Sequence, residues 1–495
     1  MSGPSSAQHV IARGAGTNGF SFVIRFAARA GFLWIAAHLF GIAAYGVFAV
    51  ATAVIELAVP LASLGLKRMI FPWLESRPAG RRPTHVLADA LLLASAATIA
   101  MIAMVIAIAW LLPDRLVSPD LRLALIALAP ALVGQVWGDI VLAATRWTHA
   151  MRWEVTGRGA VEPYTGTLVT LAAWVLGWTR FGLAIGYWAG SAALLGYALW
   201  GARRCLGPFA LREWRPEPAA LAHRARSLST AAGADALTAL AQRVDVYLVG
   251  FLLGDRAAGL YGVVRQLRTP ILQVRQAFDG ILTPVIARTM KGAGDVVTGE
   301  ATAAAMRLIL TIQLAVVLVM TVAGEPLLRL FGEHYVAGYP ALILLCLAEA
   351  ASGAFGVSEL ILYYRKPSLA LALNLLMIAV PVALVPLLAP RFGVSGAAAA
   401  VLVATFAAAA LRRAWLTRFG VRRPVLHAAA PMVGALVAAA IGFAAHGALL
   451  ARADVPLLVA SLGPAPLVLA VYAAAIWAWM RRWPGALSLA RFRVD

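Results

Sequence analysis

Apolar segments of about 20 residues follow one another along almost the whole chain, and they restrict what it can fold into more than any other feature. A segment of this length crosses the hydrocarbon of a bilayer as a helix, in which the backbone satisfies its own hydrogen bonds. Only 13% of the residues are charged, whereas a soluble domain has about 25%. The sequence therefore predicts an all-α, polytopic membrane protein with about 14 transmembrane helices, at 19–40, 42–65, 86–112, 121–145, 161–178, 182–202, 228–253, 258–288, 302–323, 340–363, 369–389, 393–412, 426–448 and 456–480.

The basic residues are distributed unevenly between the two sets of connections. Lys and Arg number 42 against 22 Asp and Glu, which gives a net charge of +20. In a soluble chain this excess would indicate a nucleic-acid partner, but here one alternate set of connections holds most of it, as cytoplasmic loops do. We therefore expect both termini in the cytoplasm and no nucleic-acid partner. The connections expected on the outer side hold only Arg115, Arg122, Arg180, Arg256, Arg329, Arg391 and Arg452.

Two short patterns recur along the chain at similar separations. FGIAAYG at 40–46 resembles LGDRAAGLYG at 253–262, and RFGLAIG at 180–186 resembles RFGVSG at 391–396. The separations are about 216 and about 211 residues, which indicates an internal repeat of six helices. Chance recurrence of Gly-rich turns is the alternative.

The repeat predicts how the chain is organised. We expect a six-helix lobe at 1–202, a cytoplasmic linker at 203–227 that contains Trp214, and a second, pseudo-symmetric six-helix lobe at 228–414. Two extra helices and a cytoplasmic tail follow at 415–495.

The stretch 243–279 carries arginines inside apolar runs. A charge at the bilayer centre costs about 2.5–3.5 kcal/mol, so these side chains should face a polar interior instead of lipid. On one ideal helix Arg265, Arg268, Arg275 and Asp279 fall within an arc of about 80°, which Pro270 will distort. An amphipathic helix on the membrane surface is the alternative for this segment.

The first apolar segment mirrors this pattern. Arg25 and Arg29 are four residues apart, so they share one face of a helix. Arg25 could instead reach the headgroups, and a local pair with an acid would explain Arg243 equally well. We interpret the whole set as a cationic lumen for an anionic substrate, formed by Arg25, Arg29, Arg243, Arg265, Arg268 and Arg275.

Acids and prolines also occur within the predicted spans. Glu56 and Asp139 have no basic residue near them in sequence, so they are the candidates for coupling to a proton or a sodium ion. Pro60, Pro270 and Pro284 remove backbone hydrogen bonds beside the expected lumen and are candidate hinges, although static kinks are common in membrane helices.

Motifs for catalysis and for cofactors are missing from the sequence. We find no P-loop, no HExxH and no GxSxG pattern. Cys205 and Cys346 are far apart and predict neither a disulfide framework nor a metal site. The connections leave no room for a soluble catalytic domain, so we expect no enzyme, cofactor or metal.

Several longer patterns resemble one family. They are Gly41, Tyr45, Gly46 and Phe48 in a GxxxYGxF turn, RVDVYLVGFLLG leading to GLYG at 243–262, EPLLRLFGEHYVAGYPALILL at 325–345 and NLLMIAVPVALVPLLAPRFGVSGAAAA at 374–400. The chain resembles the polysaccharide transporter, or lipid-linked oligosaccharide (O-antigen type) flippase, family of the multidrug/oligosaccharidyl-lipid/polysaccharide exporter superfamily. The resemblance covers nearly the whole chain.

The resemblance implies two six-helix lobes around a central cavity in the bacterial inner membrane. It implies a flippase that moves an undecaprenyl-diphosphate-linked oligosaccharide, a surface-polysaccharide or O-antigen repeat unit, to the outer leaflet by alternating access. Its partners would be that glycan, the bilayer, and a polymerase and glycosyltransferases of the same pathway. A cation-coupled multidrug exporter, a peptidoglycan-precursor flippase and a membrane-embedded polymerase or ligase remain alternatives.

Overall fold

The computed structural model describes residues 28–78, 80–113, 117–210, 212–216, 218–276, 278, 294–366, 368–419, 426–450 and 463–483. Within these ranges the regular structure is helical and no strand occurs, as the sequence predicts. The chain divides into two compact units, Met1–Phe251 and Leu252–Asp495.

The helices of unit 1 begin with a segment at 28–34 that continues into a short π-helix. The elements are η1 (Ile35–Leu39), α2 (Ile42–Ala62), α3 (Leu66–Glu75), α4 (Pro83–Leu111), α5 (Pro119–Leu128), η2 (Ala129–Ala131), α6 (Leu132–Arg146), α7 (Arg152–Thr156), η3 (Gly157–Val161), α8 (Glu162–Val175), α9 (Gly182–Leu206) and α10 (Pro218–Leu253).

The helices of unit 2 are longer on average, and one of them contains a break. They are α11 (Asp255–Leu267), α13 (Gly294–Arg329), η4 (Glu333–Gly338), α14 (Tyr339–Gly356), α15 (Glu359–Arg365), α16 (Ser368–Arg418), α17 (Leu426–Leu450) and α19 (Pro464–Arg482).

Small residues let the helices of unit 1 approach one another closely. Gly186 and Gly190 lie one turn apart on α9 and face the backbone of α8, where a Cβ at Gly190 would come within 2.8 Å of the Glu162 carbonyl oxygen. Gly134 of α6 packs in the same way against Ser191. Contacts of this kind drive helix association where lipid removes the hydrophobic difference between interior and surroundings.

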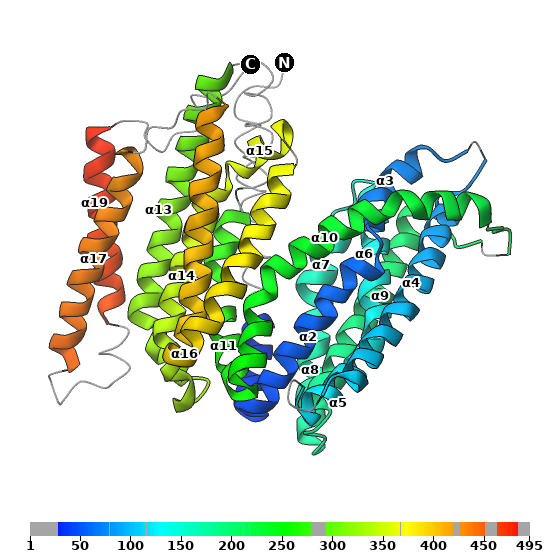
Figure 1. The fold of residues 1–495 in the computed structure, drawn as a ribbon, viewed down its shortest axis with the longest axis horizontal. Coiled ribbons are helices and arrows are strands. Elements are labelled where there is room, and N and C mark those ends of the chain that lie inside the picture. The colour runs from blue at the N-terminus through cyan, green and yellow to red at the C-terminus, as the bar shows by residue number, and fades with distance from the viewer. Residues whose placement is uncertain are drawn as a thin grey trace. The chain divides into compact units, whose positions relative to one another are not determined.

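In unit 2, α13 packs against α14 and also against the pair formed by α17 and α19, which lie side by side (Figure 1). The Tyr472 hydroxyl of α19 donates to the Thr311 carbonyl of α13 at 3.0 Å inside an apolar cluster. The pair of C-terminal helices is therefore fixed to unit 2 by a buried hydrogen bond as well as by packing.

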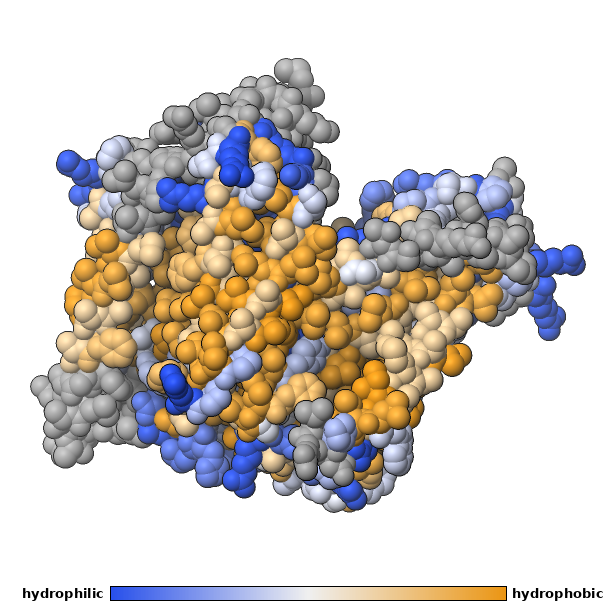
Figure 2. Space-filling view, viewed as in Figure 1, coloured by the Kyte–Doolittle hydropathy of each residue, from blue (hydrophilic) through white to orange (hydrophobic). Residues whose placement is uncertain are grey.

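The surface has the pattern of a membrane protein. Apolar side chains cover the middle of the helices, and hydrophilic residues gather toward the helix ends (Figure 2). Within the described ranges nine segments are long and apolar enough to cross a bilayer. One of them, α16, has 51 residues and bends at Gly393, where φ is 56°. At 1.5 Å per residue it is long enough for the two spans predicted at 369–389 and 393–412.

These findings confirm the all-α, polytopic fold, while the total of 14 spans stays a prediction. The lobe boundaries predicted at 202, 228 and 414 also stay a prediction. Residues up to Phe251 cluster with unit 1, because α10 is ion-paired and hydrogen-bonded to α2 and α3.

Among its described residues, the span predicted at 258–288 is interrupted next to Pro270, where a distortion is expected. The α11 helix ends at Leu267, Arg268 forms a turn, and a second helical segment begins at Thr269. Because Pro270 has no N–H to donate to the preceding turn, a break at this point is expected. The arc calculated on one ideal helix therefore does not hold across Arg268.

Candidate substrate-binding site

Three arginines of unit 2 lie against carboxylates of neighbouring helices. Arg268 Nη1 is 3.4 Å from Glu349 Oε2 on α14. Arg275 Nη2 is 4.0 Å from Glu359 Oε2 on α15, and Arg412 Nη2 of α16 is 3.4 Å from the same oxygen. These side chains are mostly removed from solvent, with exposed fractions between 9% and 25%. We call this group the unit 2 arginine cluster.

The arginine cluster carries more positive than negative charge. Glu359 contacts two guanidinium groups, so that among the described residues the cluster joins three arginines to two carboxylates. Arg265 adds a further cation one turn before the break in the helix and is partly buried. Charged side chains grouped inside a polytopic membrane protein are costly to bury, and such groups often mark a functional path.

The backbone around the cluster is shaped to receive Arg275. Its guanidinium lies over Gly356, where a Cβ would come within 2.6 Å of Nη1. Gln313 of α13 is buried and donates to the Ile271 carbonyl oxygen at 3.0 Å, which fixes the segment that carries Arg275. The cluster is thus held by polar contacts from α13 and α14 together.

The predicted site residues of unit 1 have different surroundings. Arg243 of α10 forms an ion pair with Glu56 of α2. Tyr247, one turn further along α10, donates to the Ala53 carbonyl at 2.7 Å. Arg29 is exposed in the first helical segment, and Arg25 lies outside the described residues.

Asp139 belongs to a polar network that sequence reasoning missed. Its carboxylate binds Arg158 of η3, and Lys67 Nζ lies 3.5 Å from its other oxygen. Arg158 Nη1 also donates to Glu162 at 3.0 Å and to Gln135 Oε1 at 2.8 Å. We call this group the Arg158 network.

The Arg158 network joins several helices of unit 1. Gln135 donates to Glu162 at 2.7 Å and to Ser191 Oγ at 2.8 Å, so that α6, α8 and α9 meet there. Arg158 itself lies in a π-helical turn, a distortion that is often found at functional sites. A signal is present in the sequence, since Arg158 and Glu162 are four residues apart, but the predicted spans 121–145 and 161–178 place Arg158 in the connection between them.

The three prolines predicted as hinges lie in different local structures. Pro60 lies near the end of α2, where Ser63 Oγ donates to its carbonyl at 3.0 Å. Pro270 follows the break at Arg268 and is the one that coincides with a change of helix. Pro284 lies outside the described residues.

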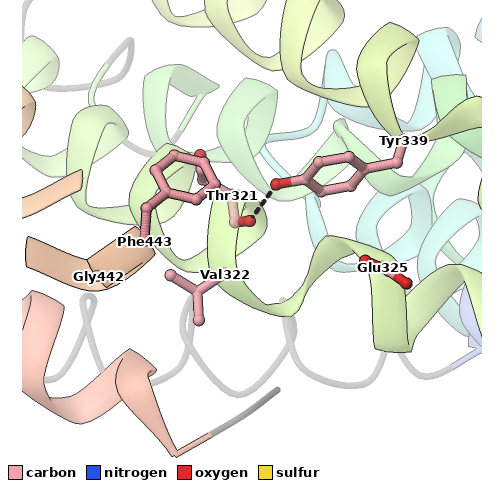
Figure 3. Close-up of a pocket in the computed structure, with 6 residues that line it drawn as sticks. All are labelled: Thr321, Val322, Glu325, Tyr339, Gly442 and Phe443. Carbon is pink, nitrogen blue, oxygen red and sulfur yellow. Dashed lines mark hydrogen bonds between the residues drawn. The ribbon is translucent and has the colours of Figure 1, made fainter. Parts of the chain in front are cut away.

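A small cavity lies apart from these charged groups. It holds about 90 Å³ between α13, α14 and α17 and is lined by Thr321, Val322, Glu325, Tyr339, Gly442 and Phe443. Figure 3 shows the Tyr339 hydroxyl directed at the Thr321 carbonyl, 2.5 Å away. Because one water occupies about 30 Å³, the cavity is far too small for a glycan or a lipid headgroup. Within the described ranges no group of three His, Cys, Asp or Glu residues could hold a metal ion.

Residues 35–340 match the family described as "Polysaccharide biosynthesis protein". The chain belongs to this family. No curated protein matches it by sequence at a significant level.

The fold of this chain is also similar to those of several solved structures. It is similar to the lipid II flippase MurJ in an inward closed conformation, with a TM-score of 0.74 and 11% identity over 94% of this chain and 98% of that one. It is also similar to an inward-facing MATE family multidrug resistance transporter of the MOP superfamily, with a TM-score of 0.61 and 13% identity over 80% and 93%. A Vibrio cholerae MATE transporter, VcmN, aligns with a TM-score of 0.56 and 14% identity over 83% and 98%.

These comparisons confirm the resemblance recognised in the sequence. The family places the chain in polysaccharide biosynthesis, and the fold is that of a multi-pass membrane protein. The roles of the individual arginines, acids and prolines stay predictions.

Proposed function

We propose that the protein is a flippase for an undecaprenyl-diphosphate-linked oligosaccharide in the bacterial inner membrane, with both termini in the cytoplasm. The glycan would cross to the outer leaflet by alternating access and would then be used by the polymerase of the same pathway. The observation that carries the proposal is the grouping of three buried or half-buried arginines with two carboxylates in the unit 2 arginine cluster.

The negative charge of a diphosphate complements the positive charge of the unit 2 arginine cluster. A diphosphate carries several negative oxygens, and arginine binds phosphate oxygens with two parallel hydrogen bonds. Arg275 and Arg412 share one carboxylate, so the anion can take up one guanidinium without leaving Glu359 unpaired. Such an exchange avoids the large cost of a buried charge with no partner.

The same cluster argues against a binding site for cationic drugs. A cation would be repelled by the surplus of arginine, and a site for cations favours aromatic faces and carboxylates instead. Glu349 and Glu359, the carboxylates of the cluster, are both engaged by arginines.

Ion coupling through Glu56 or Asp139 remains part of the proposal, with a new condition. Each carboxylate is held by an arginine, Arg243 and Arg158 respectively. A proton or sodium ion would have to displace that guanidinium. Binding of the ion would therefore be coupled to a rearrangement of the helix that carries the arginine.

The test is glycan export in a strain whose own copy of the gene is deleted. Arg268→Gln and Arg275→Gln should each reduce surface glycan about tenfold or more, since each loses one charged contact worth about 1.5–3 kcal/mol. Lipid-linked glycan should accumulate at the cytoplasmic face. Arg329→Gln is the matched control, because Arg329 is paired with Glu325 on its own helix.

Full export by both variants, at wild-type protein levels, would refute the proposed role of the cluster. If the protein rescues a strain depleted of its peptidoglycan-precursor flippase, the peptidoglycan lipid precursor would be the substrate instead. Drug resistance without glycan export would assign the multidrug alternative.

A further inference from the structure

Each unit carries cations stacked on aromatic rings at the end of a helical hairpin. In unit 1, Arg204 lies 5.9 Å from the centre of the Trp200 ring near the end of α9. In unit 2, Arg418 lies 5.1 Å from the Trp415 ring near the end of α16. A cation within about 6 Å of an aromatic face is attracted to it.

A second cation reaches each group from the start of the hairpin. Arg152, the first residue of α7, lies 5.3 Å from the Trp153 ring, which itself packs against Trp200 at 5.0 Å. Lys366, which precedes α16, lies 4.7 Å from the Trp415 ring. We call the first group corner 1 (Arg152, Trp153, Trp200, Arg204) and the second corner 2 (Lys366, Trp415, Arg418).

The two corners correspond through the internal repeat. Arg152 and Lys366, Trp200 and Trp415, and Arg204 and Arg418 are each separated by about 214 residues, between the separations of the two repeated patterns. The same arrangement thus occurs twice, on elements that correspond in the repeat.

The cations of both corners lack carboxylate partners among the described residues. The acids nearest in sequence are engaged elsewhere: Glu154 is paired with Arg146 at 3.1 Å, and Glu359 binds Arg275 and Arg412. The cations Arg152, Arg204, Lys366 and Arg418 are all exposed. Their stacking limits side-chain freedom, so an anion meets charges that are already in position.

We propose that each corner binds the phosphate headgroup of an anionic phospholipid in the leaflet that borders it. Paired basic side chains beside a Trp at the end of a membrane helix match such a headgroup in charge, and aromatic rings of this kind lie at headgroup level. The proposal does not depend on the transported substrate, so the failure of either proposal leaves the other standing.

The test counts phospholipids that remain bound to the full-length, detergent-purified protein in native mass spectrometry, with phosphatidylglycerol and phosphatidylcholine as probes. The unsubstituted chain should retain two phosphatidylglycerol molecules in preference to phosphatidylcholine. Arg204→Gln and Arg418→Gln should each remove one, and the double variant should bind phosphatidylglycerol about tenfold more weakly.

A matched control exists on the same hairpins. Arg180 and Arg391 correspond in the repeat, and Arg180 also stacks on an aromatic ring, at 5.9 Å from Phe181. They precede Gly182 and Gly393, at the other end of these helices. The double variant R180Q/R391Q removes the same charge and should retain both lipids. R204K/R418K keeps the charge at the corners and should also retain them.

The proposal is overturned if R204Q/R418Q retains as much phosphatidylglycerol as the unsubstituted chain. It is equally overturned if R180Q/R391Q loses as much, because net charge alone would then explain binding. Equal retention of phosphatidylcholine would show that the corners do not select anionic headgroups.

Discussion

The guanidinium of Arg158 balances two carboxylates at once. Asp139 and Glu162 both bind it, and their side chains are only 16% and 21% exposed. Loss of Arg158 would leave Lys67, at 3.5 Å from Asp139 and half exposed, as the nearest remaining cation. Removal of one member of such a pair costs far more than the pair itself contributes, because the partner stays behind as an uncompensated charge.

We therefore expect Arg158→Gln to lower the stability of the purified protein by about 2–4 kcal/mol. Thermal unfolding in detergent measures this as a decrease in Tm. The triple change R158Q/D139N/E162Q should recover most of the loss, since both buried carboxylates are neutralised and the remaining cation, Lys67, is half exposed. Arg329→Gln, which opens two partly exposed pairs with Glu325 and Glu333, should cost about 0.5 kcal/mol or less. An equal loss for Arg158 and Arg329 would contradict this account.

The sequence identified some charged residues of the site and missed their partners. Arg268 and Arg275 stand out because a charge in an apolar run is visible without a structure. Glu56 and Asp139 were chosen because no basic residue is near them in sequence, yet both are paired. The contacts come from other helices, and a single sequence gives no register between helices.

At the level of elements, α9 depends on the small residues along one of its faces. The Gly190 Cα faces the backbone of α8, and a Cβ there would lie 2.8 Å from the Glu162 carbonyl oxygen. Backbone cannot move aside as a flexible side chain can, so the two helices would have to separate. Gly196 lies on the same helix with nothing within 4 Å of an added Cβ.

Gly190→Ala should therefore lower the stability of the protein by about 1–3 kcal/mol through overpacking. Gly196→Ala should be neutral or raise stability by up to about 1 kcal/mol, because alanine favours a helix. The two Tm values, measured side by side, give the comparison. If both variants shift Tm equally, close packing of α8 and α9 is not the reason why a larger side chain at position 190 lowers stability.

The sequence predicted where helices occur more reliably than where they are interrupted. The long apolar runs of α4, α9 and α13 predicted spans because their length and composition suffice. The break at Arg268 and the bend at Gly393 depend on local backbone geometry within runs that look continuous. A proline or glycine marks each place, but the same residues also occur in helices that do not break.

At the scale of the whole molecule, the linker that follows α9 is fastened to unit 1. Trp214 Nε1 donates to Asp89 Oδ1 at 3.0 Å, and Arg81 binds the other oxygen at 2.6 Å. The Asp89 side chain is only 2% exposed, so these two contacts satisfy a buried carboxylate. Arg82 and Glu213 add a pair at 3.1 Å beside it.

Trp214→Ala should release this linker. Trypsin should then cleave after Arg212 about tenfold faster, because cleavage follows the population of the open segment. Trp188→Ala is a suitable control, since its indole donates to Ala127 elsewhere in unit 1. Equal cleavage rates for the two variants would show that Trp214 does not hold the linker.

The recurrence of corners 1 and 2 also bears on the origin of the chain. Equivalent cations stack on equivalent indoles in both units, although the intervening sequences have diverged widely. The simplest history is a half-length ancestor that already carried one such corner and worked as a pair of identical subunits. Gene fusion would then have joined two copies through the linker predicted at 203–227.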